Sequence, residues 1–193
     1  AVHAQRPHQL RQCRDAVRDR LVDPVAEQVD IIIRGSPSAG SDLVVRQLAE
    51  GRRLICASPD YLRKHGTPRS AADLVRHNCI GLSNQVTAPT WPIATDSSIV
   101  QFTPRGRISC DNVGMLFDLA VAGHGIVRLA DFVVGQAVRE GRLVEILADV
   151  NRSNTISLWV VMPRGRFLSP RVQAFLDFMD DWLHQTHGEN SPH

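Results

Sequence analysis

Residues 107–129, RISCDNVGMLFDLAVAGHGIVRL, contain the pattern that decides the fold class. Arg107–Cys110 is predicted to form a strand, after which Asp111 and Asn112 offer short polar side chains that cap a helix. The apolar residues that follow fall on one helical face, and the glycine pair at 123–125 ends the helix. Residues 126–129 predict a second strand. Strand, helix and strand with short connections indicate an α/β fold.

Similar patterns lie on both sides of this stretch. The β-branched run Val29–Ile33 predicts a buried strand that pairs in parallel. Residues 43–48 and 53–57 predict two further strands, with a turn at Glu50-Gly51 between them. Ser58-Pro59-Asp60 is typical of a helix start, and Gly66 is expected to end that helix.

The remaining elements continue the alternation, so largely parallel sheets are expected. Ser70 and Asp73 resemble a capping box that opens a short helix to about residue 78. A hairpin is predicted for 91–94 and 99–102, and Asp131 is expected to cap a helix that Gly141 ends. Further strands are predicted at 79–83, 143–147 and 156–162. A final helix follows Ser169-Pro170, and its apolar stripe is expected to consist of Val172, Phe175, Leu176, Met179 and Leu183. The tail after residue 187 is polar and expected to be disordered.

Composition limits the functional classes. The 193 residues suit one large domain or two small lobes, and a net charge of +2 gives no general signal for binding polyanions. No apolar run approaches the roughly 18 residues that cross a bilayer, and residues 1–20 do not resemble a signal peptide. A cytoplasmic protein with no membrane partner is therefore expected. The arginines of residues 1–28 suit either a basic arm or, because nearby aspartates offset them, a solvated helix face, which we favour.

Catalytic motifs are missing from the sequence, so we expect no enzyme, no metal site and no cofactor. The four cysteines form no C-x-x-C pair, and the histidines are scattered. Gly123-His124-Gly125 follows a helix and precedes a strand, whereas a phosphate-binding glycine loop needs the opposite order. This glycine pair is therefore interpreted as a tight turn.

Ligands of open α/β sheets bind beyond the carboxyl ends of the strands, and the loops expected there carry useful groups. They offer hydroxyls, amides, two guanidinium groups and helix N–H groups, which suit a small organic anion or an aromatic metabolite. Each residue alone is more simply explained as a cap, but together they predict a binding rim. The candidate ligand-binding residues are Arg34, Gly35, Ser36, Ser83, Asn84, Asp111, Asn112, Val113, Arg128 and Leu129.

Several stretches, in order and spacing, resemble one known family. They are Asp19–Asp23 with Val29–Gly35, the run Cys56-Ala57-Ser58-Pro59-Asp60-Tyr61-Leu62, and Gly66-Thr67-Pro68 followed by Asp73, Leu74 and His77. Further matches are Cys110–Ala120, Ala122–Ile126, Gly141–Val144, Met162-Pro163 and Ser169–Phe178. Together they resemble the effector-binding domain of LysR-type transcriptional regulators, over about residues 19–183.

The resemblance implies two Rossmann-like lobes of the type 2 periplasmic-binding-protein kind, joined by two crossover segments. Residues 1–54 and 163–193 would form lobe I, and residues 55–162 lobe II. A small-molecule inducer would bind in the cleft, a homodimer or higher homo-oligomer is expected, and ligand binding would change how subunits pair. DNA would be contacted only through a helix-turn-helix domain that this sequence does not contain.

Residues 1–18 depart from the family pattern, which opens with a strand, a helix and a second strand. They contain no apolar run, so lobe I is expected to lack its first strand, as a truncated or shifted reading frame would explain. Two other classes of protein are the competing interpretations. A solute-binding protein of the same two-lobe fold is the alternative, although four unpaired cysteines suit a reducing compartment better. A small-molecule enzyme is the third class.

Overall fold

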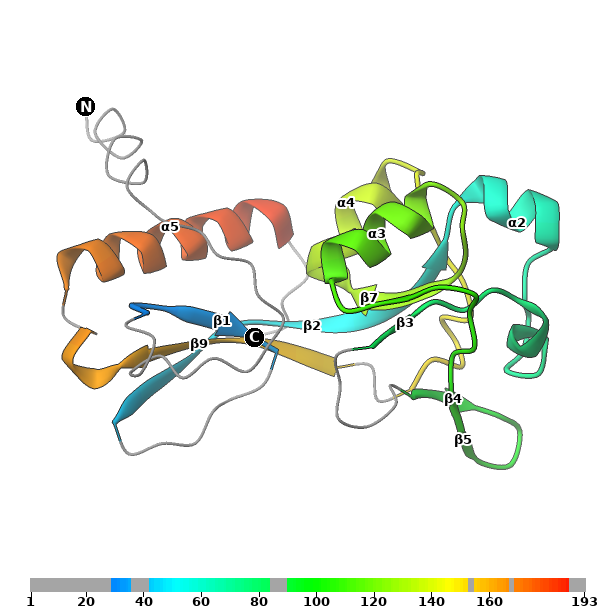
Figure 1. Ribbon diagram of the computed structural model, residues 1–193, viewed down its shortest axis with the longest axis horizontal. Helices are drawn as coiled ribbons and strands as arrows, with labels where there is room; N and C mark the ends of the chain where they lie inside the picture. The colour runs from blue at the N-terminus through cyan, green and yellow to red at the C-terminus, as the bar shows by residue number, and fades with distance from the viewer. Residues whose placement is uncertain (1–28, 36–41, 84–89, 153–154, 167–168, 188–193) are drawn as a thin grey trace. The chain divides into compact units, whose positions relative to one another are not determined.

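The computed structural model describes residues 29–35, 42–83, 90–152, 155–166 and 169–187 (Figure 1). The sequence-based expectations for residues 1–28 and for the tail after residue 187 lie outside these ranges. The chain divides into two compact units. Unit 1 comprises residues 1–50 and 157–193, and unit 2 comprises residues 51–156.

Unit 1 is built on a sheet in which the strand order is β1-β9-β2. The strands are β1 (Ile32–Arg34), β9 (Thr155–Pro163) and the first part of β2 (Leu43–Ala57). The prediction of a buried parallel strand at 29–33 is wrong in two respects. β1 pairs antiparallel with β9, placing Ile32 opposite Val161, and Ile33 is 39% exposed. Antiparallel pairing lets one face of a strand meet solvent, as it does here.

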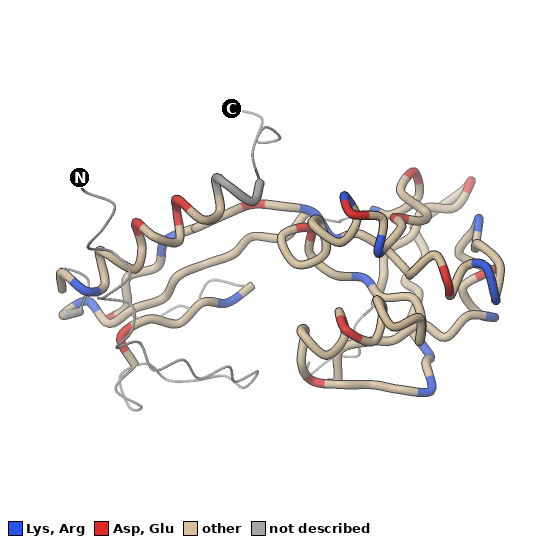
Figure 2. Tube along the Cα trace, turned by 90° about the horizontal axis from the view of Figure 1, so that it is seen from above, with Lys and Arg blue, Asp and Glu red and all other residues tan. Residues whose placement is uncertain are grey.

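Helix α5 (Pro170–His187) covers this sheet, as Figure 1 shows. Val172 and Leu176, four residues apart on one helical face, pack on Val160 and Met162 of β9. All four side chains are at most 1% exposed. Acidic positions fall along α5 in Figure 2, and Asp180 accepts from Arg46 of β2 at 2.6 Å. The predicted final helix and its apolar stripe are therefore confirmed.

Unit 2 contains the second part of β2, which pairs antiparallel with β7 (Val127–Ala130) and β8 (Val144–Glu145). β2 is one continuous strand, so the predicted turn at Glu50-Gly51 is wrong. Gly51 instead allows the side chain of Asp131 to approach the backbone of β2 closely. A Cβ on Gly51 would lie 2.3 Å from Oδ1 of Asp131, a side chain that also accepts from the backbone N–H of Arg52 at 3.0 Å.

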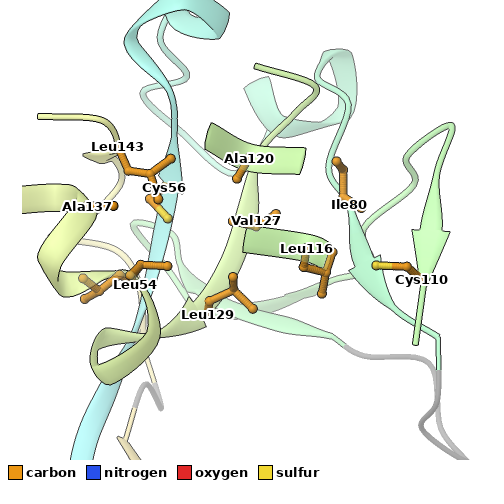
Figure 3. Close-up of a cluster of buried hydrophobic side chains, with 11 residues drawn as sticks. Leu54, Cys56, Ile80, Cys110, Leu116, Ala120, Val127, Leu129, Ala137 and Leu143 are labelled. Atoms are coloured by element: carbon orange, nitrogen blue, oxygen red, sulfur yellow. The ribbon is translucent and has the colours of Figure 1, made fainter. Parts of the chain in front are cut away.

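Two helices cover one face of the β2–β7 pair, as Figure 3 shows in close-up. They are α3 (Val113–Val121) and α4 (Asp131–Arg139). Strand residues Leu54, Cys56, Val127 and Leu129 meet helix residues such as Leu116 in one cluster. Burial of each large aliphatic side chain contributes about 1.5–3 kcal/mol. We call this face of the two strands the apolar face.

The opposite face of β2 and β7 packs on shorter elements. These are α2 (Pro59–His65), the 3-10 turn η1 (Asp73–Arg76) and the hairpin of β4 (Trp91–Ala94) and β5 (Ile99–Phe102). The hairpin was predicted, and its register pairs Ala94 with Ile99. The core of this side contains Ile55, Ala57, Tyr61, Leu74, Cys79, Trp91, Ile93, Ile126 and Ile146.

Parallel pairing is confined, among the described strands, to a small part of unit 2. β3 (Gly81–Leu82) pairs in parallel with β6 (Ser109–Cys110), and a parallel bridge joins Cys79 to Ile126. The pairs β1–β9, β2–β7, β2–β8 and β4–β5 are all antiparallel, so the expectation of largely parallel sheets is wrong. The parallel elements nevertheless bring the carboxyl ends of β3, β6 and β7 to one edge of unit 2.

Helix ends mostly follow the sequence signals. Ser58 caps α2 by accepting from the Tyr61 N–H at 3.2 Å, and Gly66 ends it at φ +83°. Ser70 and Asp73 form a reciprocal capping box, although the element is only a 3-10 turn. Asp131 is not the cap of α4. It is the first helical residue, and its Oδ1 accepts from the Phe132 N–H at 2.8 Å.

Candidate functional site

The shared edge of unit 2 brings together some of the candidate ligand-binding residues. The Ser83 N–H donates to the Cys110 carbonyl at 2.8 Å, which sets Ser83 beside the start of the segment leading into α3. Ser83 and Asp111 are both exposed. The loops that follow β3 and β6 therefore lie side by side at this edge. Asn84 lies outside the described residues.

Asn112 provides the cap of α3, because its Oδ1 accepts from the Met115 N–H at 2.9 Å. An open hollow of about 500 Å³ begins there and follows the outer side of α3 to Ala122 and His124. Val113, the next residue, is half-buried and turned toward the apolar core of unit 2.

Three other candidates lie elsewhere. Leu129 is 6% exposed and its side chain is part of the apolar cluster, so it contributes packing rather than a rim group. Arg34 is the last residue of β1 in unit 1 and is half-buried, and Gly35 directly after it is exposed. Ser36 lies outside the described residues.

Arg128 is held in a polar network on the face opposite the apolar cluster. Its Nε donates to Oδ1 of Asn151 at 3.0 Å and its Nη2 donates to the Arg152 carbonyl at 3.2 Å. Burial, and after it the charge of Arg53, lower the pKa of Arg128 to about 10. The guanidinium is thus still charged at neutral pH, and it is fixed in one orientation.

Asn151 is the centre of this network and is 3% exposed. Its Nδ2 donates to the Arg53 carbonyl at 2.6 Å, while its Oδ1 accepts from Arg128. A tight turn presents it, because the Leu147 carbonyl accepts from the Asn151 N–H at 2.9 Å and Leu147 itself has φ +57°. A left-handed conformation costs a leucine about 1–2 kcal/mol, so the surrounding contacts enforce this turn.

Thiol or metal chemistry has little support in the described residues. Burial raises the pKa of Cys56 and of Cys79 to about 12, so both remain protonated thiols at neutral pH. The described residues contain no group of three or more His, Cys, Asp or Glu that could hold a metal ion. In the same residues, every helix is too short or too polar to cross a membrane.

The fold is that of an α/β domain of two units, and sequence comparison gives its family. The sequence model of the LysR substrate binding domain matches residues 1–184. The chain therefore belongs to the LysR substrate-binding domain family, which has the two-lobe α/β fold of type 2 periplasmic-binding proteins. The match begins at residue 1, further toward the N-terminus than the resemblance seen from single motifs.

Curated relatives support this assignment. The HTH-type transcriptional regulator CrgA of Neisseria meningitidis is 31% identical over 163 residues, which are 84% of this chain and 54% of CrgA. The HTH-type transcriptional activator TtdR of Escherichia coli K12 is 25% identical over 172 residues, 89% of this chain and 55% of TtdR. The chain thus spans about half the length of the curated relatives it matches.

Solved structures agree in fold. The CrgA regulatory domain, from a LysR-type transcriptional regulator of Neisseria meningitidis, superposes with a TM-score of 0.75 at 31% identity, covering 82% of this chain and 78% of that one. Full-length AphB, the Vibrio cholerae virulence activator, gives a TM-score of 0.65 at 25% identity, covering 83% of this chain and 54% of AphB.

Sequence reasoning missed Arg53 and Asn151. Arg53 was assigned only to a strand, yet it has the same parity as Ile55 and Ala57, which the alternation of β2 places on a buried face. That parity could have singled it out. Asn151 carried no comparable signal, because its burial depends on the hairpin of β4 and β5 and on the turn from Leu147, which are remote or irregular.

Proposed function

We propose that this chain is the effector-sensing part of a LysR-type transcriptional regulator, and that it binds a small organic molecule to control transcription. The observation that carries the proposal is the polar edge of unit 2. Ser83, Asp111 and Asn112 gather there at the carboxyl ends of strands, which is where α/β folds bind ligands. Membership of the LysR substrate-binding domain family supports the same conclusion.

In this proposal units 1 and 2 correspond to the two lobes of the family, with boundaries near residues 54 and 163. Arg34, Gly35 and Ser36 would contribute from lobe I, and Ser83, Asn84, Asn112 and Arg128 from lobe II. The chain would act as a homodimer or larger homo-oligomer in the cytoplasm. Promoter DNA would be contacted by a helix-turn-helix domain, which the names of the HTH-type relatives support.

A transport role is less well supported. The relatives described above are named as transcriptional regulators, whereas a solute-binding protein of similar fold would deliver its ligand to a membrane complex. An enzyme is also less well supported, because the buried thiols are protonated and those relatives are named as regulators. We therefore propose a sensor without catalysis.

A thermal-shift screen of the purified chain against small organic acids and aromatic metabolites tests the proposal. A ligand in large excess over its Kd stabilises the folded state by about 3–4 kcal/mol, which raises the Tm by several degrees. Asn112→Ala is expected to weaken binding of the hit while leaving a cooperative melt. Val144→Ala is the control, because Val144 is 40% exposed on β8, a strand that is not part of this edge.

A second measurement tests the regulatory part. A reporter gene under the promoter that the full-length regulator occupies should respond to the compound found in the screen. A compound that binds saturably but leaves transcription unchanged would contradict the proposal and favour the solute-binding class. Turnover of the compound would revive the enzyme class.

A further inference from the structure

Arg53 lies half-buried in unit 2 with little to neutralise its charge. Burial lowers the pKa of its guanidinium, and its one side-chain hydrogen bond among the described residues is from Nη1 to the Thr155 carbonyl at 3.1 Å. A guanidinium has five N–H donors in a planar fork. Within the described part of the chain, no carboxylate comes within ion-pair distance of Arg53. Most of its donors therefore have no acceptor among the described residues.

Arg53 and Arg128 face the same side of the sheet. Arg128 lies opposite Ile55 across the β2–β7 ladder, and Arg53 lies two residues before Ile55, so the two arginines are diagonal neighbours. Each of the two repels the other, and this repulsion is part of what lowers the pKa of Arg128. Asn151 fixes both strands at this point by bonding the Arg53 carbonyl and the Arg128 side chain. The hydrogen bonds of Asn151 thus hold two like charges close to each other.

Arg52, the adjacent residue, shows the contrast. It points to the other face of β2, where its Nη2 forms an ion pair with Glu145 at 3.2 Å. A strand that neutralises one arginine with a carboxylate leaves its neighbour, on the more buried side, with a single carbonyl. A bound anion would neutralise Arg53 as Glu145 neutralises Arg52, because a carboxylate accepts two parallel N–H bonds from a guanidinium.

We propose that Arg53 and Arg128 form an anion-binding pair that holds the carboxylate of the effector. The proposal rests on the proposed function, because it names the chemical class of the ligand that the sensor binds. Arg53 supplies the unused fork and contacts the carboxylate directly. Arg128, oriented by Asn151, adds the second positive charge. Binding relieves the repulsion between the two guanidinium groups, so the carboxylate is favoured over an uncharged group of the same shape.

The test compares carboxylates with their primary amides on the whole chain. Benzoate, phenylacetate, succinate and malate are each paired with the matching amide, and saturable thermal shifts are followed by calorimetric titration. We expect a carboxylate to bind where its amide does not. Arg53→Gln keeps a donor for the Thr155 carbonyl but removes the charge, and should raise the Kd about 10- to 100-fold. Arg53→Lys should weaken binding less.

Arg52→Gln is the matched control and should leave the Kd within about threefold, because its ion pair is exposed. The Tm of ligand-free Arg53→Gln should equal or exceed that of the wild type, since a repulsion is removed. Equal binding of carboxylate and amide, or an unchanged Kd in Arg53→Gln, would overturn the inference. Binding of amides alone would overturn it while leaving the proposed sensor intact. Binding of no compound of either kind would count against both.

Discussion

The two faces of the β2–β7 pair in unit 2 differ in what adjacent residues do. On one face Leu54, Cys56, Val127 and Leu129 pack under α3 and α4 in a purely apolar cluster. On the other face Arg53 lies two residues before Ile55 and Arg128 lies opposite Ile55, so charged and core side chains share one surface. Consecutive residues of one strand thus serve packing and, we propose, binding. Candidate site residues in this fold are better chosen by the face of the strand on which they lie than by their closeness in sequence.

The largest loss of stability is expected from a substitution in the apolar face. Leu129→Ala should lower the free energy of unfolding by about 2–5 kcal/mol, because it empties space in a packed cluster. Urea unfolding followed by circular dichroism measures it. Val144→Ala is the control, since Val144 is 40% exposed and should cost little. A small loss for Leu129→Ala, together with a weaker effector Kd, would mean that Leu129 faces the ligand after all.

A somewhat smaller effect is expected on the polar face. Asn151→Ala removes both hydrogen bonds of a buried amide, and it should lower the free energy of unfolding by about 1–3 kcal/mol. It should also release Arg128, and so weaken binding of a carboxylate effector. Asp149→Ala, an exposed change in the same turn, is the control. Unfolding by urea and titration with the effector give the two readings, and no change in either would contradict the role given to Asn151.

A single cap at the end of β2 should matter less again. Ser58 is 3% exposed and accepts from the Tyr61 N–H at 3.2 Å, so Ser58→Ala should cost about 1 kcal/mol. The Tm, measured by calorimetry, should fall by a few degrees. The exposed ion pair of Asp60 with Arg63 offers the comparison, since Asp60→Asn should change the Tm very little. An equal shift in both variants would show that the buried cap has no special role.

The smallest effect concerns pH. Tyr61 accepts at its hydroxyl oxygen from the Asn78 N–H at 2.9 Å, and the same hydroxyl is hydrogen-bonded to Nδ1 of His77 at 3.2 Å. Burial, and then the charge of His65, lower the pKa of His77 below 6.5, whereas Asp73 raises it and Arg76 lowers it.

A histidine with a lowered pKa takes up its proton less readily in the folded state than in the unfolded state. Stability is therefore full above pH 6.5 and falls as the pH drops from 6.5 toward the folded-state pKa of His77. His77→Gln should flatten this decrease, as urea unfolding at a series of pH values would show. His124→Gln, at an exposed position, should leave the slope as in the wild type. A slope unchanged by His77→Gln would remove His77 as its source.

Sequence patterns predicted the elements whose signals are local. The cap and glycine of α2, the cap of α3, the hairpin of β4 and β5 and the stripe of α5 all depend on residues within about a turn or a hairpin of each other. The family resemblance was also visible in motifs alone, and the family match confirms it.

The sequence did not predict the features that depend on residues far away in the chain. Gly51 looked like a turn because nothing in the sequence indicates that Asp131, 80 residues later, packs against it. The direction of β1 depends on β9, more than a hundred residues away. In the candidate site, Ser83 and Asp111 do share an edge, but Leu129 is in the core, and Arg53 needed its cross-strand neighbour Arg128 to gain significance.

Because β2 and β9 each run through both units, the two units are difficult to exchange separately during evolution. The division between units 1 and 2 falls inside both strands, between residues 50 and 51 and between 156 and 157. Proteases and successful insertions favour exposed loops, and neither boundary is one. Recombination that exchanged one unit would cut both strands. The two units of this chain are therefore expected to diverge together by point substitution rather than to be exchanged by shuffling.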